Sequence, residues 1–268
     1  MTSRLEEALD AAHADGRGAF IGYLPLGYPD LRTSIDAAVA LAQAGADVIE
    51  LGPPYSDPVM DGPIIQEAAN AALEVGFKIR DLFPAVREIT ERTGVPVVIM
   101  TYWNLVVQYG VARFADDLAA AGGAGLITPD IAPDAAAEWI AESTRTGLDR
   151  VFLAAPTSTD ERLELIVRNT TGFVYTVSTM GITGERAEVD AAARTLVGRL
   201  RAHGAQRCCV GIGISTPEQV AETLTYADGA IAGTALVRAL RDGGVEGLAE
   251  TARALVAGTA HGARSANV

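Results

Sequence analysis

Lysine and histidine are scarce in this sequence of 268 residues, and each scarcity excludes a class of chemistry. Lys78 is the only lysine, and the histidines are His13, His203 and His261. A Schiff-base aldolase needs a lysine on a strand, whereas Lys78 lies just before an expected helix. A metal-dependent aldolase needs several histidine ligands, and these three lie in or near helices or in the tail. We therefore expect neither imine chemistry nor a metal site.

Positive charge, cysteine and long apolar runs are also lacking. With 21 Lys+Arg against 34 Asp+Glu, the net charge of −13 argues against nucleic-acid binding, which needs clustered cations. No apolar stretch approaches about 18 residues, and the first 15 residues lack a signal-peptide core, so we expect no membrane span or export. Cys208 and Cys209 are adjacent and form no disulfide framework. This pattern fits a reducing cytosol, and we expect a cytoplasmic protein.

Short apolar runs alternate with longer segments of helical period along the whole chain. The expected strands are 20–24, 47–51, 95–100, 125–128, 150–154, 172–177, 208–212 and 229–232. The expected helices are 31–44, 64–74, 79–93, 111–121, 135–143, 160–167, 189–202, 217–224, 235–240 and 246–255. Strands that are apolar on both faces indicate a parallel sheet covered by helices. Eight such units predict an α/β fold, a (β/α)₈ TIM barrel, with an open doubly wound sheet as the alternative.

No linker or change in composition divides the chain, so we expect one domain over residues 1–268. Residues 1–15 should contain an extra amphipathic helix ahead of the first strand. Residues 257–268 are small and polar, and we expect a frayed tail there.

Glu50 lies inside an otherwise apolar strand, where a carboxylate is costly unless it is paired or protonated. Burial would raise its pKa, as in a general acid or base; a structural ion pair with an arginine is the alternative. The following loop, residues 52–63, contains Asp57 and Asp61 among glycines and prolines. Asp57 suits a turn, whereas Asp61 is either a turn residue or a second carboxylate facing the barrel mouth.

Glycine-rich loops follow the last three expected strands, at residues 181–184, 211–215 and 233–234. Such loops offer backbone N–H groups and a helix N-terminus to a phosphate. Ser215 and Thr216, which precede Pro217, are better explained as helix caps than as catalytic residues. The three loops together predict a phosphorylated ligand.

The stretch 47–66, DVIELGPPYSDPVMDGPIIQ, closely resembles the signature of the tryptophan synthase alpha chain family. The resemblance continues through LGYP at 26–29, MTYWN at 100–104, GITG at 181–184 and the loops of Gly213 and Gly233. It covers nearly the whole chain. It implies a lyase that cleaves indole-3-glycerol phosphate by a retro-aldol reaction, giving indole and glyceraldehyde 3-phosphate for tryptophan biosynthesis.

The resemblance also implies roles for individual residues. Glu50 resembles the family's acid/base, and Asp61 the carboxylate that binds the indole N–H. Residues that match the substrate pocket are Tyr23, Met100, Ile127, Leu153, Tyr175 and Thr183. Those that match the phosphate site are Gly184, Gly213, Gly233 and Thr234.

The family pairs its alpha chain with a beta chain that carries pyridoxal phosphate, so the resemblance implies an assembly of two alpha and two beta chains and no cofactor in this chain. We expect the loops 53–62 and 179–189 to cover the site, with Pro53, Pro54 and Tyr55 in the docking surface. A free-standing lyase, a non-catalytic binding barrel and another phosphate-binding barrel enzyme are alternatives.

The sequence departs from the family at a few positions. Tyr23 and Ile212 stand where phenylalanine is common, and Thr234 replaces a usual serine. Pro53 replaces a small aliphatic residue, and the sixth loop reads STMG at 178–181, where many relatives have a basic residue. These changes concern pocket shape and loop closure and leave both carboxylates in place.

Overall fold

Eight parallel strands close into a barrel in the computed structural model, which describes residues 3–177, 186–211 and 213–261. Each strand pairs with the next, and β8 pairs with β1. The strands are β1 Ala19–Pro25, β2 Val48–Gly52, β3 Val97–Met100, β4 Gly125–Thr128, β5 Asp149–Ala154, β6 Val174–Val177, β7 Cys208–Gly211 and β8 Gly229–Ala232. The predicted TIM barrel is confirmed, and the open sheet is excluded.

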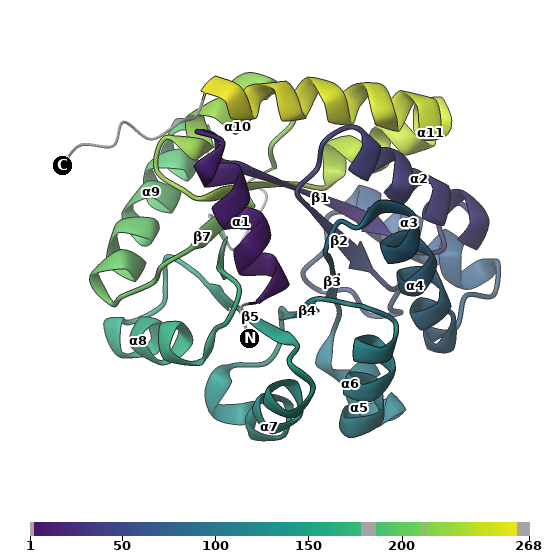
Figure 1. Cartoon of the computed structure of the whole chain (residues 1–268), viewed down its shortest axis with the longest axis horizontal. Helices are drawn as coiled ribbons and strands as arrows, with labels where there is room; N and C mark the ends of the chain where they lie inside the picture. Colours follow the sequence, from purple (N-terminus) through teal and green to yellow (C-terminus); the bar gives the residue numbers. More distant parts are fainter. Residues whose placement is uncertain (1–2, 178–185, 212, 262–268) are drawn as a thin grey trace.

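Helices surround the barrel on its outside (Figure 1). They are α2 Leu31–Gln43, α3 Pro63–Glu74, α4 Leu82–Thr93, α5 Trp103–Tyr109, α6 Val111–Ala120, α7 Ala137–Thr146, α8 Asp160–Asn169, α9 Arg186–Ala202, α10 Pro217–Leu224 and α11 Thr234–Ala257. Short 3₁₀ turns occupy Ile79–Asp81, Pro133–Ala135 and Gly258–His261. None of the helices in the described part of the chain combines the length and apolar character that crossing a bilayer requires.

The predicted extra helix is α1, Arg4–Ala14, and it lies across one end of the barrel (Figure 1). Leu5, Leu9 and Ala12 of α1 pack with barrel-interior residues such as Ile21 and Val48. The Ser3 hydroxyl accepts a hydrogen bond from the backbone N–H of Glu6, which caps this helix. Because α1 closes the amino-terminal end of the barrel, the carboxyl ends of the strands are left for a site.

Two helical predictions differ from the structure in an informative way. The sequence reading omitted α5, whose first N–H, on Trp103, donates to the carboxylate of Asp130 at 2.9 Å. The capping residue belongs to the loop after β4, so the sequence next to α5 contains no capping signal that would predict the helix. The segments expected at 235–240 and 246–255 are both parts of α11, which is kinked at Gly244 (φ 62°).

Candidate functional site

A cavity of about 160 Å³ opens at the carboxyl ends of the strands. Polar and small residues from β1, β2, β6, β7 and the loops after β2, β7 and β8 line it, together with apolar side chains. The lining residues are Tyr23, Glu50, Met60, Asp61, Gly62, Ile65, Met100, Tyr175, Gly211, Gly213, Ile231, Gly233 and Thr234. The cavity therefore brings together both predicted carboxylates and two of the three predicted glycine loops, while the loop at 181–184 lies outside the described residues.

Glu50 is fully buried in β2, with 0% of its surface exposed. Neither carboxylate oxygen has a hydrogen-bond partner among the described residues, so the structural ion pair considered for this strand is not formed there. Burial, and then the negative charge of Asp61, raise the pKa of Glu50 to about 8. Glu50 is consequently protonated at neutral pH, as a general acid must be before it gives up a proton.

Asp61 reaches the same cavity from the loop between β2 and α3. Its backbone is fixed on both sides, because its N–H donates to the Pro58 carbonyl and its carbonyl accepts from Gln66 Nε2. Burial raises the pKa of Asp61 to about 6. Asp61 is thus mostly ionised at the pH at which Glu50 is protonated, so the two carboxyl groups are suited to different tasks.

A pair of tyrosines holds the loop that carries Asp61. The hydroxyl of Tyr102 accepts a hydrogen bond from the backbone N–H of Met60 at 2.9 Å. The Tyr102 ring stacks on Tyr55 of the same loop, with ring centroids 5.0 Å apart. Asn104 Nδ2 in turn donates to the Tyr55 hydroxyl. Sequence reasoning did not give Tyr102 or Met60 a role, because these contacts join segments about 40 residues apart.

The end of the cavity where the sequence predicts a phosphate is built from β7, β8 and the first turn of α11. Gly233 precedes this helix, and no side chain caps its first N–H groups among the described residues. Free N–H groups at a helix N-terminus favour an anion, and Thr234 adds a hydroxyl there. Gly213 has a φ of +64° and leaves open space beside its Cα. Thr216 caps α10 by accepting from the Gln219 N–H, as expected.

Not every predicted pocket residue lines this cavity. Ile127 is buried in the barrel interior, and Leu153 packs against that interior cluster while remaining partly exposed. Both lie in the core that supports Met100 and Tyr175. Thr183 and Gly184 lie outside the described residues, so their predicted roles stay predictions.

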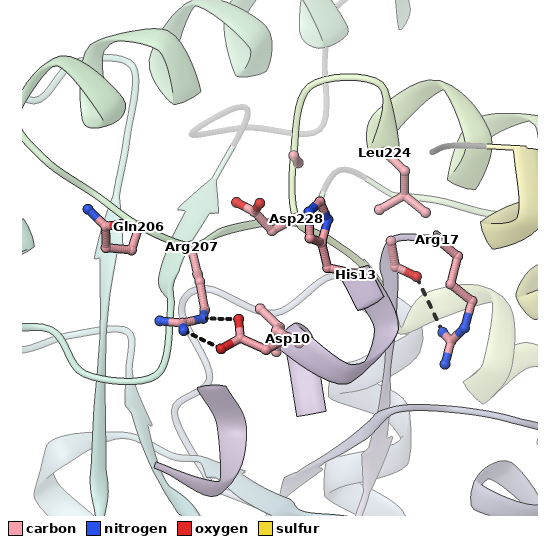
Figure 2. A pocket seen from close by; sticks show the side chains of 10 residues that line it. Asp10, His13, Arg17, Gln206, Arg207, Leu224 and Asp228 are labelled. Atoms are coloured by element: carbon pink, nitrogen blue, oxygen red, sulfur yellow. Dashed lines mark hydrogen bonds and ion pairs between the residues drawn. The ribbon is translucent and has the colours of Figure 1, made fainter. Parts of the chain in front are cut away.

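A larger cavity, of about 240 Å³, lies at the opposite end of the barrel (Figure 2). Its charged walls are already paired: Arg207 binds Asp10 through two hydrogen bonds, and Arg17 binds Asp47 in the same manner. Asp228 accepts from Arg201 and from the Cys208 N–H. These pairs tie α1 and the strand starts together, which is a stabilising arrangement and contains no reactive group like Glu50.

The charge around the carboxyl-end cavity is unusual. No lysine, arginine or histidine of the described residues lines it, and the described residues contain no cluster of histidine, cysteine, aspartate or glutamate that could hold a metal ion. A buried acid, a second carboxylate, four aromatic or thioether side chains and a helix N-terminus that favours anions remain. That combination suits proton transfer to an aromatic, phosphorylated substrate.

Comparison with known proteins identifies the family. The sequence profile of the tryptophan synthase alpha chain matches residues 9–263. The chain belongs to the tryptophan synthase alpha chain family. A tryptophan synthase alpha chain of Leifsonia xyli subsp. xyli is 63% identical over 260 residues, covering 97% of this chain and 100% of the relative.

Solved structures agree with this assignment. A structure of Mycobacterium tuberculosis tryptophan synthase matches with a TM-score of 0.92 and 50% identity, covering 97% of this chain and 99% of that one. A chain of the tryptophan synthase complex from Pyrococcus furiosus matches with a TM-score of 0.81 and 36% identity, covering 90% and 98%. As an alpha chain of tryptophan synthase, the protein is a lyase of tryptophan biosynthesis, and its substrate is indole-3-glycerol phosphate.

The positions at which this chain departs from its family can now be located in the structure. The phenol of Tyr23 stands in the cavity, and Thr234 begins α11. Pro53 and Pro54 are buried, so they do not supply the exposed docking surface that the sequence suggested. The exposed apolar side chains of that loop are Val59, with 81% of its surface accessible, and Met60, with 43%. Ile212 and the STMG segment lie outside the described residues.

Proposed function

We propose that Glu50 and Asp61 together catalyse the cleavage of indole-3-glycerol phosphate in this chain. The observation that carries the proposal is a buried acid that has no hydrogen-bond partner among the described residues and shares one cavity with a second carboxylate of lower pKa. Residues whose environments push their pKa values apart are typical of acid–base pairs.

The proposed reaction begins with Glu50 donating its proton to C3 of the indole ring. The lone pair of the ring nitrogen then forms a C=N bond, and the ring becomes a cation that can accept an electron pair. Asp61 accepts a hydrogen bond from the ring N–H and stabilises the positive charge. This electrostatic interaction is stronger in a site shielded from water.

In the second step the ionised Glu50 accepts the proton of the hydroxyl on the carbon bonded to C3. The O–H electrons form the aldehyde C=O bond, and the C–C bond breaks. Its electron pair returns to the ring and neutralises the nitrogen. The products are indole and glyceraldehyde 3-phosphate, and Glu50 regains its proton, so the step balances without a metal or an imine.

The remaining residues bind and orient the substrate in this proposal. Tyr23, Met100 and Tyr175 enclose the indole, with Ile127 and Leu153 supporting that wall from the barrel core. Gly213, Gly233 and Thr234, with Gly184 and Thr183 from the sixth loop, bind the phosphate or the glycerol. The α11 N-terminus attracts the phosphate locally, which matters because the whole chain is acidic.

We further propose that a beta chain is the partner and carries the pyridoxal phosphate, with no cofactor in this chain, in an assembly of two alpha and two beta chains. The match to a chain from a tryptophan synthase complex supports a partner, as do the exposed Val59 and Met60 beside the cavity. The two buried free cysteines support a reducing, cytoplasmic location.

The decisive experiment incubates the purified chain with indole-3-glycerol phosphate and detects indole and glyceraldehyde 3-phosphate directly. Product formation by the wild type and its loss in Glu50→Gln support the proposal. Cleavage that is unchanged by addition of a beta chain would instead favour a free-standing lyase, and no cleavage under either condition would reject the assigned reaction.

A further inference from the structure

Tyr23 places a phenol in the cavity that both carboxylates line. It is the register partner of Glu50 across β1 and β2, so both side chains project to the same face of the sheet. Its ring crosses towards the loop of Asp61: a Cβ built on Gly52 would lie only 2.3 Å from the Tyr23 hydroxyl oxygen. On its other side, a Cβ on Gly233 would lie 3.1 Å from the ring. The ring therefore occupies a slot that two glycines keep open.

The Tyr23 hydroxyl and the Asp61 carboxylate complement each other. Within the described part of the chain neither group forms a hydrogen bond, and both face the cavity. Burial raises the pKa of Tyr23, and Asp61 raises it further as the strongest nearby charge, ahead of Glu50. A phenol that stays protonated can only gain by donating to a neighbouring carboxylate.

Building on the proposed function, we propose that Tyr23 is a positioning residue of the reaction, whose hydroxyl donates a hydrogen bond to the ionised Asp61 carboxylate and orients it towards the indole N–H. The phenol supplies a donor to the one anion of the site that must stay charged. It thereby offsets part of the desolvation that favours the protonated, inactive form of Asp61.

Other described groups that face Asp61 are less suited to supply this donor. Glu50 of β2 carries the same sign of charge when ionised and no additional donor once its proton has gone to the substrate. The Tyr102 hydroxyl, next to β3, keeps its own O–H, but its oxygen is fixed by the Met60 N–H on the backbone of the loop. The charge of Glu50 acts on the Tyr175 hydroxyl of β6 more strongly than the charge of Asp61 does. No cationic side chain of the described residues lines the cavity. Tyr23 is thus the best placed donor in this part of the chain.

The test compares wild type with Tyr23→Phe, which removes one oxygen and keeps the ring in its slot. Its readout is the pH profile of kcat/KM for cleavage of indole-3-glycerol phosphate, because the acidic limb reports the free-enzyme group that must be ionised. We expect the limb of Tyr23→Phe to move up by about one pH unit, the size of one hydrogen bond to a charged group. At pH values below the limb, kcat/KM of Tyr23→Phe should be about 10-fold lower than that of the wild type. Tyr109→Phe, whose hydroxyl binds Asp117 on the outer helices, is the matched control and should leave the limb in place.

Carbon NMR of the Asp61 carboxyl in the free chain measures the same pKa without turnover. An equal pKa in wild type and Tyr23→Phe, or a profile lowered at all pH values without a shift, would overturn the inference while leaving the proposed function intact. A wild type that does not cleave the substrate would instead reject the proposed function.

Discussion

Asp61 raises the pKa of Glu50, because both carboxyl groups face one cavity and cannot easily carry their charges at the same time. Burial is the larger cause and acts on both groups. Glu50 lies deeper, so its pKa of about 8 exceeds the value of about 6 at Asp61. The deeper burial of Glu50 therefore makes it the acid, and the shallower Asp61 is the anion.

Glu50→Gln should abolish most of the activity while preserving the fold. The amide fills the same space but can neither give a proton to the indole nor take one from the hydroxyl. We expect kcat to fall at least about 100-fold, the usual range for losing a general acid–base. Single-turnover cleavage assays measure the loss, and circular dichroism checks the fold. A folded variant with wild-type turnover would exclude Glu50 as the acid/base.

Glu50 should also make the wild type less stable as the pH rises. Its pKa is about 8 in the folded chain and 4.5 when unperturbed, so the folded state holds the extra proton between these values. The contribution of Glu50 to stability is therefore fully present below the lower value, falls with rising pH through the interval, and levels off above about 8. The steepest loss is roughly 1.4 kcal/mol per pH unit.

The measurement is urea unfolding of wild type and Glu50→Gln at several pH values above about 7, where Asp61, with its pKa of about 6, is mostly ionised in both. Groups shared by the two proteins cancel in the difference. We expect the unfolding free energy of Glu50→Gln, relative to that of the wild type, to increase with pH up to about pH 8. A difference that stays constant with pH would show that Glu50 is not the buried acid described here.

Part of this site could be predicted from the sequence because its polar residues stand out against the apolar segments that contain them. A carboxylate in an apolar strand, as at Glu50, is anomalous without knowledge of the fold. The barrel itself follows from the count of apolar strands and from the periodicity of the helices between them. Glycines after the last strands predict a phosphate site at the same end of the barrel, and this remains a prediction.

What the sequence did not reveal depends on contacts between distant segments. The cap of α5 comes from Asp130, and the hydrogen bond from the Met60 N–H to the Tyr102 hydroxyl joins two separate loops. The burial of Pro53 and Pro54 was also hidden, since prolines in a loop are more often exposed. Periodicity describes one segment at a time, so contacts of this kind leave no trace in it.

Gly213→Val should weaken binding of the phosphate. The glycine has a φ of +64°, so a branched side chain strains the loop, and the open space beside it would be filled where the phosphate is expected. We expect the KM for indole-3-glycerol phosphate to rise at least about 10-fold, the loss of one or two hydrogen bonds to a charged group. Inhibition by glycerol phosphate should weaken equally.

Gly204→Val is the matched control, because Gly204 has a φ of +91°, is equally free of close neighbours, and lies before β7 at the other end of the barrel. It should cost similar stability and leave KM unchanged. Equal KM values in both variants would place the phosphate elsewhere.

Docking of a beta chain should involve the exposed side chains of the loop between β2 and α3. Val59 is 81% exposed next to Met60, which itself lines the cavity, and an apolar side chain so exposed gains most from being covered. Val59→Asp should therefore raise the Kd for a beta chain at least about 10-fold, since a charge would be buried in the contact. Val75→Asp is the control: Val75 is 62% exposed at the far end of α3, away from the cavity. Titration calorimetry measures both affinities.

Hydrogen exchange of the wild type, with and without a beta chain, should then show slower exchange in residues 53–62, because closing this loop excludes water from the contact between Asp61 and the indole. Equal affinities of the two aspartate variants, together with unchanged exchange in this loop and an unchanged cleavage rate, would leave the free-standing lyase as the better account.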